Sequence, residues 1–116
     1  MKILLVDDEV ELVSAMAERL ALRGMDVEWT DSGTKALKMA RECQFDVAVL
    51  DMKMPKLSGL ELRRMLSEIC PDMKFIFLSG HGSEADFKAG SAEATCYLIK
   101  PVNLDELIAK LGCCAC

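Results

Sequence analysis

Five short apolar runs alternate with helical patterns along this chain, and this alternation constrains the fold more than any other feature. The runs are KILLV (2–6), MDVEW (25–29), FDVAVL (45–50), KFIFLS (74–79) and TCYLI (95–99). Strands that alternate with helices are typical of βαβ units, whose successive strands are parallel. The first, third and fourth runs are almost continuously apolar, as strands covered on both faces are, whereas the alternating second run suits an edge. The sequence therefore predicts an α/β fold with one parallel five-stranded sheet, whose edges are the second and fifth strands.

The first three helical segments have clear sequence signals. From Val10 to Arg23 the apolar residues recur every four positions, and Gly24 follows as a stop. Ser32 and Ser58 stand directly before the second and third helical patterns, where a side-chain oxygen can accept hydrogen bonds from the free N–H groups of a first turn. These signals predict three amphipathic helices that cover the sheet.

The last two helical segments differ in strength. Residues 82–94 contain two glycines and one large apolar side chain, so this fourth helix is predicted to be the weakest and the readiest to move. Asn103 is a plausible cap for a fifth helix from about Leu104 to Leu111, which is predicted to end at Gly112.

Composition limits the classes of function. The 116 residues carry a formal net charge of −5 without any Lys/Arg-rich run, which argues against direct nucleic-acid contact by this domain. The apolar runs are too short to cross a bilayer, and no signal peptide is seen, so a cytoplasmic location is expected. The only C-x-x-C, at 113–116, has no second pair that would complete a structural zinc site. No linker divides residues 1–116, so a single domain is expected.

Polar side chains follow four of the predicted strands, at the point where each strand ends. They are Asp7 and Asp8, Asp51, Ser79 and Lys100. Ligands of a parallel α/β sheet bind beyond the carboxyl ends of its strands. Any one of these residues could simply cap a helix, start a turn or be solvated, but together they predict a shared site.

Three carboxylates at one edge require a counter-charge. Two like charges about 4 Å apart repel by about 4 kcal/mol at an effective dielectric near 20. Mg²⁺ is a hard cation that a few carboxylates can hold, and Lys100 can supply further positive charge. A metal and a lysine beside a carboxylate indicate phosphoryl transfer, with Asp51 as the nucleophile. Glu9, the third consecutive acid, is interpreted instead as a favourable charge at the start of the first helix.

Four segments of the sequence resemble the receiver domains of response regulators. They are LLVDDE (4–9), DMKMPKLSG (51–59), FLSGHGS (77–83) and YLIKPVNLDEL (97–107). The resemblance covers essentially the whole chain. It implies a doubly wound, flavodoxin-like sheet of strand order 2-1-3-4-5 with five helices, and a receiver domain over residues 1–116 with no output domain in this chain.

The resemblance also implies a role for each residue of the site. Asp51 matches the aspartate phosphorylated by a kinase phosphohistidine. Asp8 matches the direct Mg²⁺ ligand, Asp7 the acid that usually acts through metal-bound water, and Lys53 the residue whose backbone carbonyl completes the protein ligands. Lys100 matches the lysine that pairs with the phosphoryl group. The implied cofactor is Mg²⁺, for which Mn²⁺ can substitute.

Further positions match the family's switch and its kinetic control. Ser79 matches the hydroxyl that hydrogen-bonds the phosphoryl group. Tyr97 matches the aromatic residue that turns inward when Ser79 moves toward the phosphoryl group. The alternative interpretation of Tyr97 is a ring that packs on the edge strand. Pro101 matches a proline whose preceding peptide bond is commonly cis. Lys53 and His81 occupy positions that tune dephosphorylation in this family.

The implied function is a signalling switch that catalyses its own Mg²⁺-dependent phosphorylation and slow dephosphorylation. Its partners would be a sensor histidine kinase and an output domain or downstream protein, reached through the fourth helix, fifth strand and fifth helix, with homodimerisation on activation. Three alternatives fit the residues less well. A haloacid-dehalogenase-type phosphatase needs a second Asp where Lys53 stands, a degenerate docking receiver would lack some of these acids or the lysine, and a nucleotide-binding module needs a glycine-rich phosphate loop.

Overall fold

The computed structural model describes residues 1–52, 54, 56–79 and 96–114. Its strands are β1 (Lys2–Val6), β2 (Asp26–Thr30), β3 (Val47–Asp51), β4 (Lys74–Ser79) and β5 (Cys96–Ile99). Its helices are α1 (Val10–Leu22), α2 (Gly33–Glu42), α3 (Gly59–Ile69) and α5 (Leu104–Cys114). The fourth helix predicted over 82–94 lies outside the described residues.

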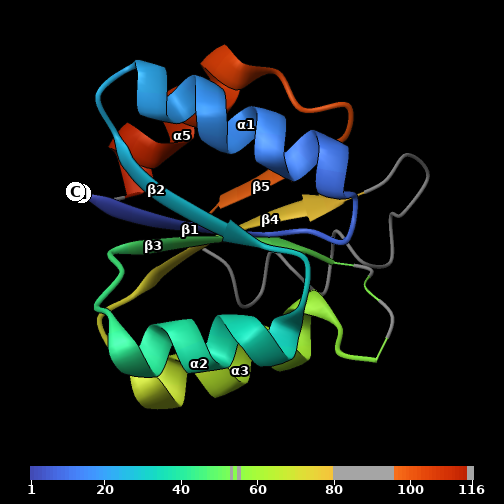
Figure 1. The fold of residues 1–116 in the computed structure, drawn as a ribbon, viewed down its shortest axis with the longest axis vertical. Coiled ribbons are helices and arrows are strands. Elements are labelled where there is room, and N and C mark those ends of the chain that lie inside the picture. The colour runs from blue at the N-terminus through green and yellow to red at the C-terminus, as the bar shows by residue number, and fades with distance from the viewer. Residues whose placement is uncertain (53, 55, 80–95, 115–116) are drawn as a thin grey trace.

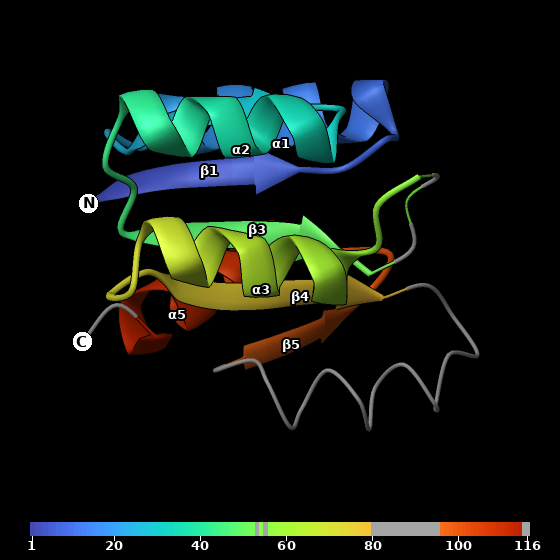
Figure 2. The ribbon, with the colours of Figure 1, turned by 90° about the horizontal axis from the view of Figure 1, so that it is seen from below.

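The five strands form one parallel sheet in the order β2-β1-β3-β4-β5. Helices α1 and α5 cover one face of this sheet and α2 and α3 cover the other (Figure 1). Figure 2 shows the same layers from below, with the carboxyl ends of the strands at one edge. The predicted fold class, strand order and edge strands are confirmed.

The core consists of two apolar layers separated by the sheet. Ile3 and Leu5 of β1 pack under α1 and α5, whereas Leu4 and Val6 pack under α2 and α3. Alternate residues of β3 and β4 divide between the same two layers, because successive side chains of a strand point to opposite faces. A central strand with no solvated face needs apolar residues at every position, which explains the continuous runs in the sequence.

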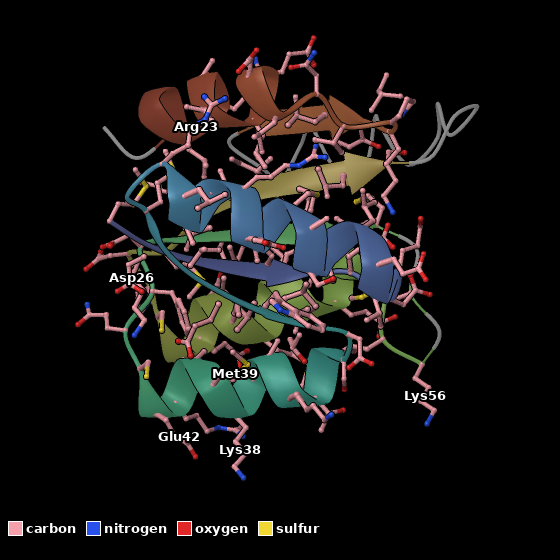
Figure 3. All side chains as sticks on the ribbon, turned by 45° about the horizontal axis from the view of Figure 1, so that its top comes forward. Arg23, Asp26, Lys38, Met39, Glu42 and Lys56 are labelled. Atoms are coloured by element: carbon pink, nitrogen blue, oxygen red, sulfur yellow. The ribbon has the colours of Figure 1, made fainter. Side chains whose placement is uncertain are left out.

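Polar side chains occupy the outer faces of the helices. On α2, Lys38 and Glu42 point away from the sheet (Figure 3). The predicted caps are present as well. Ser32 Oγ accepts a hydrogen bond at 3.4 Å from the backbone N–H three residues later, and Ser58 Oγ accepts the equivalent bond at 3.2 Å. Asn103 Oδ1 accepts from the N–H groups two and three residues later, at 2.8 and 3.2 Å. The three helix starts are therefore fixed locally, as predicted.

The predicted end of the last helix at Gly112 is wrong, because α5 continues through this glycine to Cys114. A glycine ends a helix when its backbone adopts the left-handed conformation. Gly24 does so after α1, with φ of 83°, but Gly112 has no positive φ. None of the described helices is long and apolar enough to cross a membrane.

Candidate functional site

Three carboxylates meet at the carboxyl edge of the sheet. Asp7 and Asp8 directly follow β1, and Asp51 is the last residue of β3. Each offers an oxygen that lies within 4.8 Å of an oxygen of the other two. Asp7 and Asp51 are 1% and 4% exposed, whereas Asp8 is exposed to solvent. The parallel pairing of β1 with β3 thus produces the cluster that the sequence predicts.

Backbone contacts hold Asp7 in place. Its N–H donates to the carbonyl oxygen of Thr30 at 3.2 Å, and its Oδ1 accepts from the N–H of Glu9 at 2.9 Å. Its buried Oδ2 accepts no hydrogen bond of ordinary geometry from the described residues, although Lys100 Nζ lies 2.9 Å from it. At that distance the Lys100 ammonium forms an ion pair with Oδ2. Because Oδ2 accepts no hydrogen bond from the described residues, its lone pairs can still bind a further cation.

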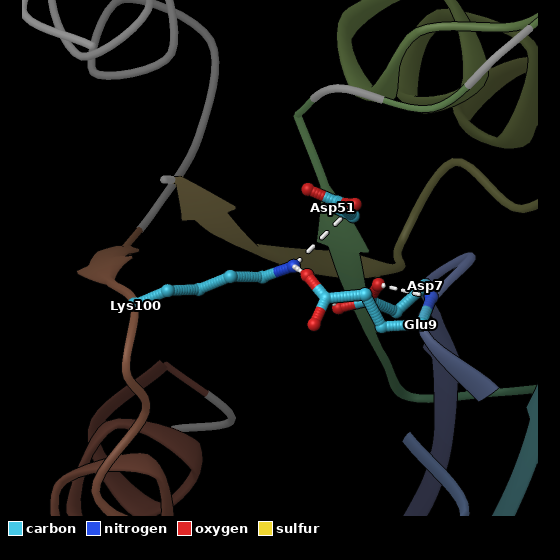
Figure 4. A network of polar contacts seen from close by, with 4 residues as sticks. All are labelled: Asp7, Glu9, Asp51 and Lys100. Atoms are coloured by element: carbon cyan, nitrogen blue, oxygen red, sulfur yellow. Dashed lines mark hydrogen bonds and ion pairs between the residues drawn. The ribbon is translucent and has the colours of Figure 1, made fainter. Parts of the chain in front are cut away.

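Lys100 extends from the segment after β5 into the acidic cluster (Figure 4). Its Nζ lies 2.9 Å from Asp7 Oδ2, 2.9 Å from Glu9 Oε1 and 3.5 Å from Asp51 Oδ2. Burial by itself would lower the pKa of Lys100, but the close contacts of its ammonium with the carboxylates of Asp7 and Glu9 and the attraction of Asp51 outweigh burial and raise the pKa above its ordinary value. Lys100 therefore keeps its positive charge throughout the physiological pH range.

The cluster has an excess of negative charge. Within the described part of the chain, the ammonium of Lys100 contacts the carboxylates of Asp7, Glu9 and Asp51, and Asp8 adds a fourth carboxylate to the cluster. The ligand atoms that the described residues Asp7, Asp8 and Asp51 bring together are carboxylate oxygens, which Mg²⁺ and Mn²⁺ prefer, and Asp7 Oδ2 is a buried acceptor that takes no hydrogen bond from the described residues. The donor set therefore fits a hard divalent cation.

Gly59 lets α3 begin directly against the end of β3. A Cβ at this position would lie 2.5 Å from the backbone oxygen of Asp51 and 3.0 Å from the Cα of Met52. The N–H of Gly59 also donates to the carbonyl oxygen of Met52 at 3.1 Å. The glycine of the D-x-x-M-P-x-x-x-G pattern is thus required by a close backbone approach beside Asp51.

We expect Gly59→Ala to lower the free energy of unfolding by about 2 kcal/mol, because the added methyl group must displace backbone atoms at Asp51. Urea denaturation would measure this loss. Gly112→Ala is the matched control, since a Cβ there meets nothing within 4 Å. Within a helix this control should stabilise by about 0.5–1 kcal/mol. A Gly59→Ala variant as stable as the unchanged protein would contradict the steric argument.

The predicted switch residues lie on β4, which pairs with the strand of Asp51, and on β5, the next strand along the sheet. Ser79 is the buried last residue of β4, and its carbonyl oxygen accepts from the N–H of Lys100 at 2.7 Å. Tyr97 of β5 is half-buried and packs against the apolar layer under α2 and α3. The peptide bond between Lys100 and Pro101, the candidate for a cis bond, is cis.

Two predicted residues cannot be placed, and one residue was missed. Lys53, with its backbone carbonyl, and His81 lie outside the described residues. Glu9 was interpreted only as a helix-start charge, yet its carboxylate accepts a hydrogen bond from Lys100 Nζ at 2.9 Å. Its position in the same loop as Asp7 and Asp8 was the available signal.

Comparison with known proteins identifies the family. A family model described as "Response regulator receiver domain" matches residues 3–112. The chain belongs to this family. Among curated relatives of this receiver domain, Response regulator MprA of Mycobacterium leprae (strain TN) is 37% identical over 112 residues, which are 96% of this chain and 49% of that protein. MprA of Mycobacterium avium (strain 104) is also 37% identical, with the same coverage. The receiver domain therefore spans about half the length of these curated relatives.

Solved receiver structures share the fold. A response regulator receiver domain protein from Clostridium thermocellum superposes with a TM-score of 0.89 at 35% identity, covering 98% of this chain and 93% of that one. A response regulator from Burkholderia pseudomallei, described with a phosphorylated aspartic acid, a calcium ion and citrate, gives a TM-score of 0.83 at 30% identity, covering 93% and 64% of the two chains. The receiver fold thus accounts for nearly the whole chain.

Proposed function

We propose that this receiver domain is a phosphorylation-dependent signalling switch with Asp51 as its acceptor. The phosphoryl group would come from the phosphohistidine of a sensor histidine kinase or from a small phosphodonor. One observation carries the proposal: Asp51 ends a buried strand beside two further acids, with Lys100 Nζ 3.5 Å from its Oδ2. The response regulator from Burkholderia pseudomallei, described with a phosphorylated aspartic acid, supports it.

The chemistry is displacement at phosphorus. A carboxylate oxygen of Asp51 attacks the phosphorus atom while the bond from phosphorus to the donor's imidazole nitrogen breaks, and the departing imidazole takes up a proton. With acetyl phosphate, the bond from phosphorus to the acetate oxygen breaks instead. Lys100 can donate a hydrogen bond to a phosphoryl oxygen on Asp51, and the Ser79 hydroxyl is proposed to donate a second.

Asp7, Asp8, Asp51 and the backbone carbonyl of Lys53 are the residues proposed to hold Mg²⁺, with Mn²⁺ as a substitute. When bound, the ion supplies positive charge that offsets the phosphoryl oxygens. The calcium ion named with the Burkholderia pseudomallei structure supports a divalent site in this family. The chain's own contribution is to keep Asp7 and Asp51 buried and fixed, so that little reorganisation is needed.

Reversal of the switch is proposed to be slow hydrolysis by the domain itself. A water molecule attacks the phosphorus atom of the aspartyl phosphate, inorganic phosphate leaves, and the carboxylate of Asp51 is restored. Lys53 and His81 are proposed to tune this step through the access of water. In this sense the domain catalyses both its own phosphorylation and its own dephosphorylation.

The output is proposed to be a change of surface. The new charge on Asp51 would draw in the Ser79 hydroxyl, Tyr97 would turn inward, and the surface of the fourth helix, β5 and α5 would change. An output domain or downstream protein would bind that surface, and homodimerisation on activation belongs to the same proposal. We place the domain in the cytoplasm, where it would contact no nucleic acid directly.

Incubation with acetyl phosphate and Mg²⁺ tests this proposal. We expect an acyl phosphate on Asp51, located by borohydride reduction of the modified residue and peptide mass spectrometry. Removal of the divalent cation with a chelator should slow labelling by about 100-fold, because the acidic cluster then repels the anionic donor. A modification on another residue, or a rate that is indifferent to the chelator, would contradict the assignment.

A further inference from the structure

The contact between Glu9 and Lys100 joins two loops that are 91 positions apart in the sequence. Lys100 Nζ donates to Glu9 Oε1 at 2.9 Å, as short as its contact with Asp7 and shorter than the 3.5 Å to Asp51 (Figure 4). The Lys100 side chain is 14% exposed and that of Glu9 is 60% exposed. One end of this ion pair is therefore fixed in the site, and the other end lies at the solvent boundary.

The start of α1 does not use the Glu9 carboxylate. Glu9 is the N-cap residue of this helix, with φ of −82° and ψ of 86°, but its side chain makes no capping hydrogen bond. Its backbone N–H is committed to Asp7 Oδ1 at 2.9 Å, which fixes where the side chain begins. The carboxylate is consequently directed to Lys100 and not to the first turn of the helix.

The ammonium of Lys100 has three N–H donors, and it lies closer to Asp7 and Glu9 than to Asp51. Two of the carboxylate contacts of Nζ, to Asp7 and Glu9, lie on the β1 side, and both are shorter than the contact to Asp51. A phosphoryl group on Asp51 requires a donor from the same ammonium. Asp7 is buried and held by the backbone, so the exposed Glu9 is the partner that can give way.

We propose that Glu9 is a positioning residue that holds Lys100 toward β1, and that release of this contact limits the rate of phosphoryl transfer to Asp51. This inference rests on the proposed function, because it describes how the same site is restrained before the donor arrives. It assigns to Glu9 a role in kinetics, in place of the helix-start role expected from the sequence.

The test compares initial rates of Asp51 labelling by acetyl phosphate at saturating Mg²⁺. Glu9→Gln removes the charge that competes for Lys100, and we expect the rate to rise about threefold, as suits an ion pair with one exposed partner. Glu9→Asp keeps the charge but is one methylene too short to maintain the contact, so it should also accelerate labelling. Glu11→Gln is the matched control, because Glu11 is exposed in the first turn of α1 and makes no ion pair with any described residue.

A second measurement reports the contact without any phosphodonor. The NMR signal of the Lys100 ε-methylene, identified by its absence in Lys100→Met, should move in Glu9→Gln and stay in place in Glu11→Gln. The rate increase should also persist at about 0.5 M salt, where a long-range effect of charge on the donor would be screened.

The outcomes separate this inference from the function on which it rests. If the unchanged protein is not labelled on Asp51, the proposed function fails. If the unchanged protein is labelled but Glu9→Gln is labelled no faster, or the Lys100 signal does not move, the role of Glu9 is overturned. Acceleration by Glu9→Gln together with an unchanged rate for Glu9→Asp would also overturn it, because charge alone would then explain the effect.

Discussion

Asp51→Asn is expected to abolish covalent labelling by acetyl phosphate, with a loss of at least about 1,000-fold in rate. The amide that replaces the carboxylate has no anionic oxygen to attack phosphorus, and it is a weaker ligand for a divalent cation. The substitution preserves size and shape, and it removes one buried like charge from the cluster. The free energy of unfolding should therefore rise by about 1 kcal/mol, which separates lost chemistry from lost structure.

Asp72→Asn is the matched control for this variant. Asp72 is an exposed aspartate between α3 and β4, at the opposite edge of the sheet from the acidic cluster. It should be labelled, on Asp51, at the rate of the unchanged protein. The acceptor assignment would be wrong if Asp51→Asn retained that rate, or if the label appeared on Asp7 or Asp8 with similar speed.

Lys100→Met is expected to weaken both catalysis and stability. The labelling rate should fall by about 100-fold, because a preorganised positive charge on the phosphoryl oxygens is lost. The free energy of unfolding should fall by about 3 kcal/mol, since Asp7 and Asp51 stay buried without their cationic partner. Lys110→Met, on the exposed side of α5, should change neither quantity appreciably.

Mg²⁺ and pH test the electrostatic origin of that loss. Added Mg²⁺ should stabilise Lys100→Met more than the unchanged protein, because the cation then replaces the missing counter-charge. The pKa of Lys100 is raised on folding, so its stabilising contribution is complete below the ordinary lysine pKa of 10.5 and declines as the pH rises above that value. The difference in stability between the two proteins should therefore be constant from about pH 6 to pH 9 and shrink in more alkaline solution. A deficit that was unaffected by Mg²⁺ would indicate a packing defect instead.

Features decided by local chemistry could be predicted from the sequence. The run VAVL is apolar at every position because β3 is covered on both faces, and the serines and asparagine before the helices cap them as expected. The proximity of the three aspartates could be predicted because parallel strands end at one edge of a sheet. Each of these inferences needs only a short segment of sequence and a general rule.

Contacts between distant segments could not be predicted from the sequence alone. The stretch LLVDDE does not indicate that the carboxylate of Glu9 contacts a lysine 91 positions later. That contact depends on how the loops after β1 and β5 lie against each other. The prediction of where α5 ends was wrong for a different reason. A glycine is compatible with either continuing or ending a helix, and Gly112 keeps a negative φ inside α5, which continues to Cys114.

The separation of Glu9 and Lys100 along the chain also has a consequence during synthesis on the ribosome. Asp51 is translated well before Lys100, which directly follows β5, the strand that pairs with β4. Chains are made from the N-terminus, and contacts between distant residues form late. A growing or prematurely ended chain therefore carries Asp51 without the ammonium that lies 3.5 Å from its carboxylate in the complete domain. If Asp51 is the acceptor as proposed, unfinished copies would accept phosphoryl groups poorly.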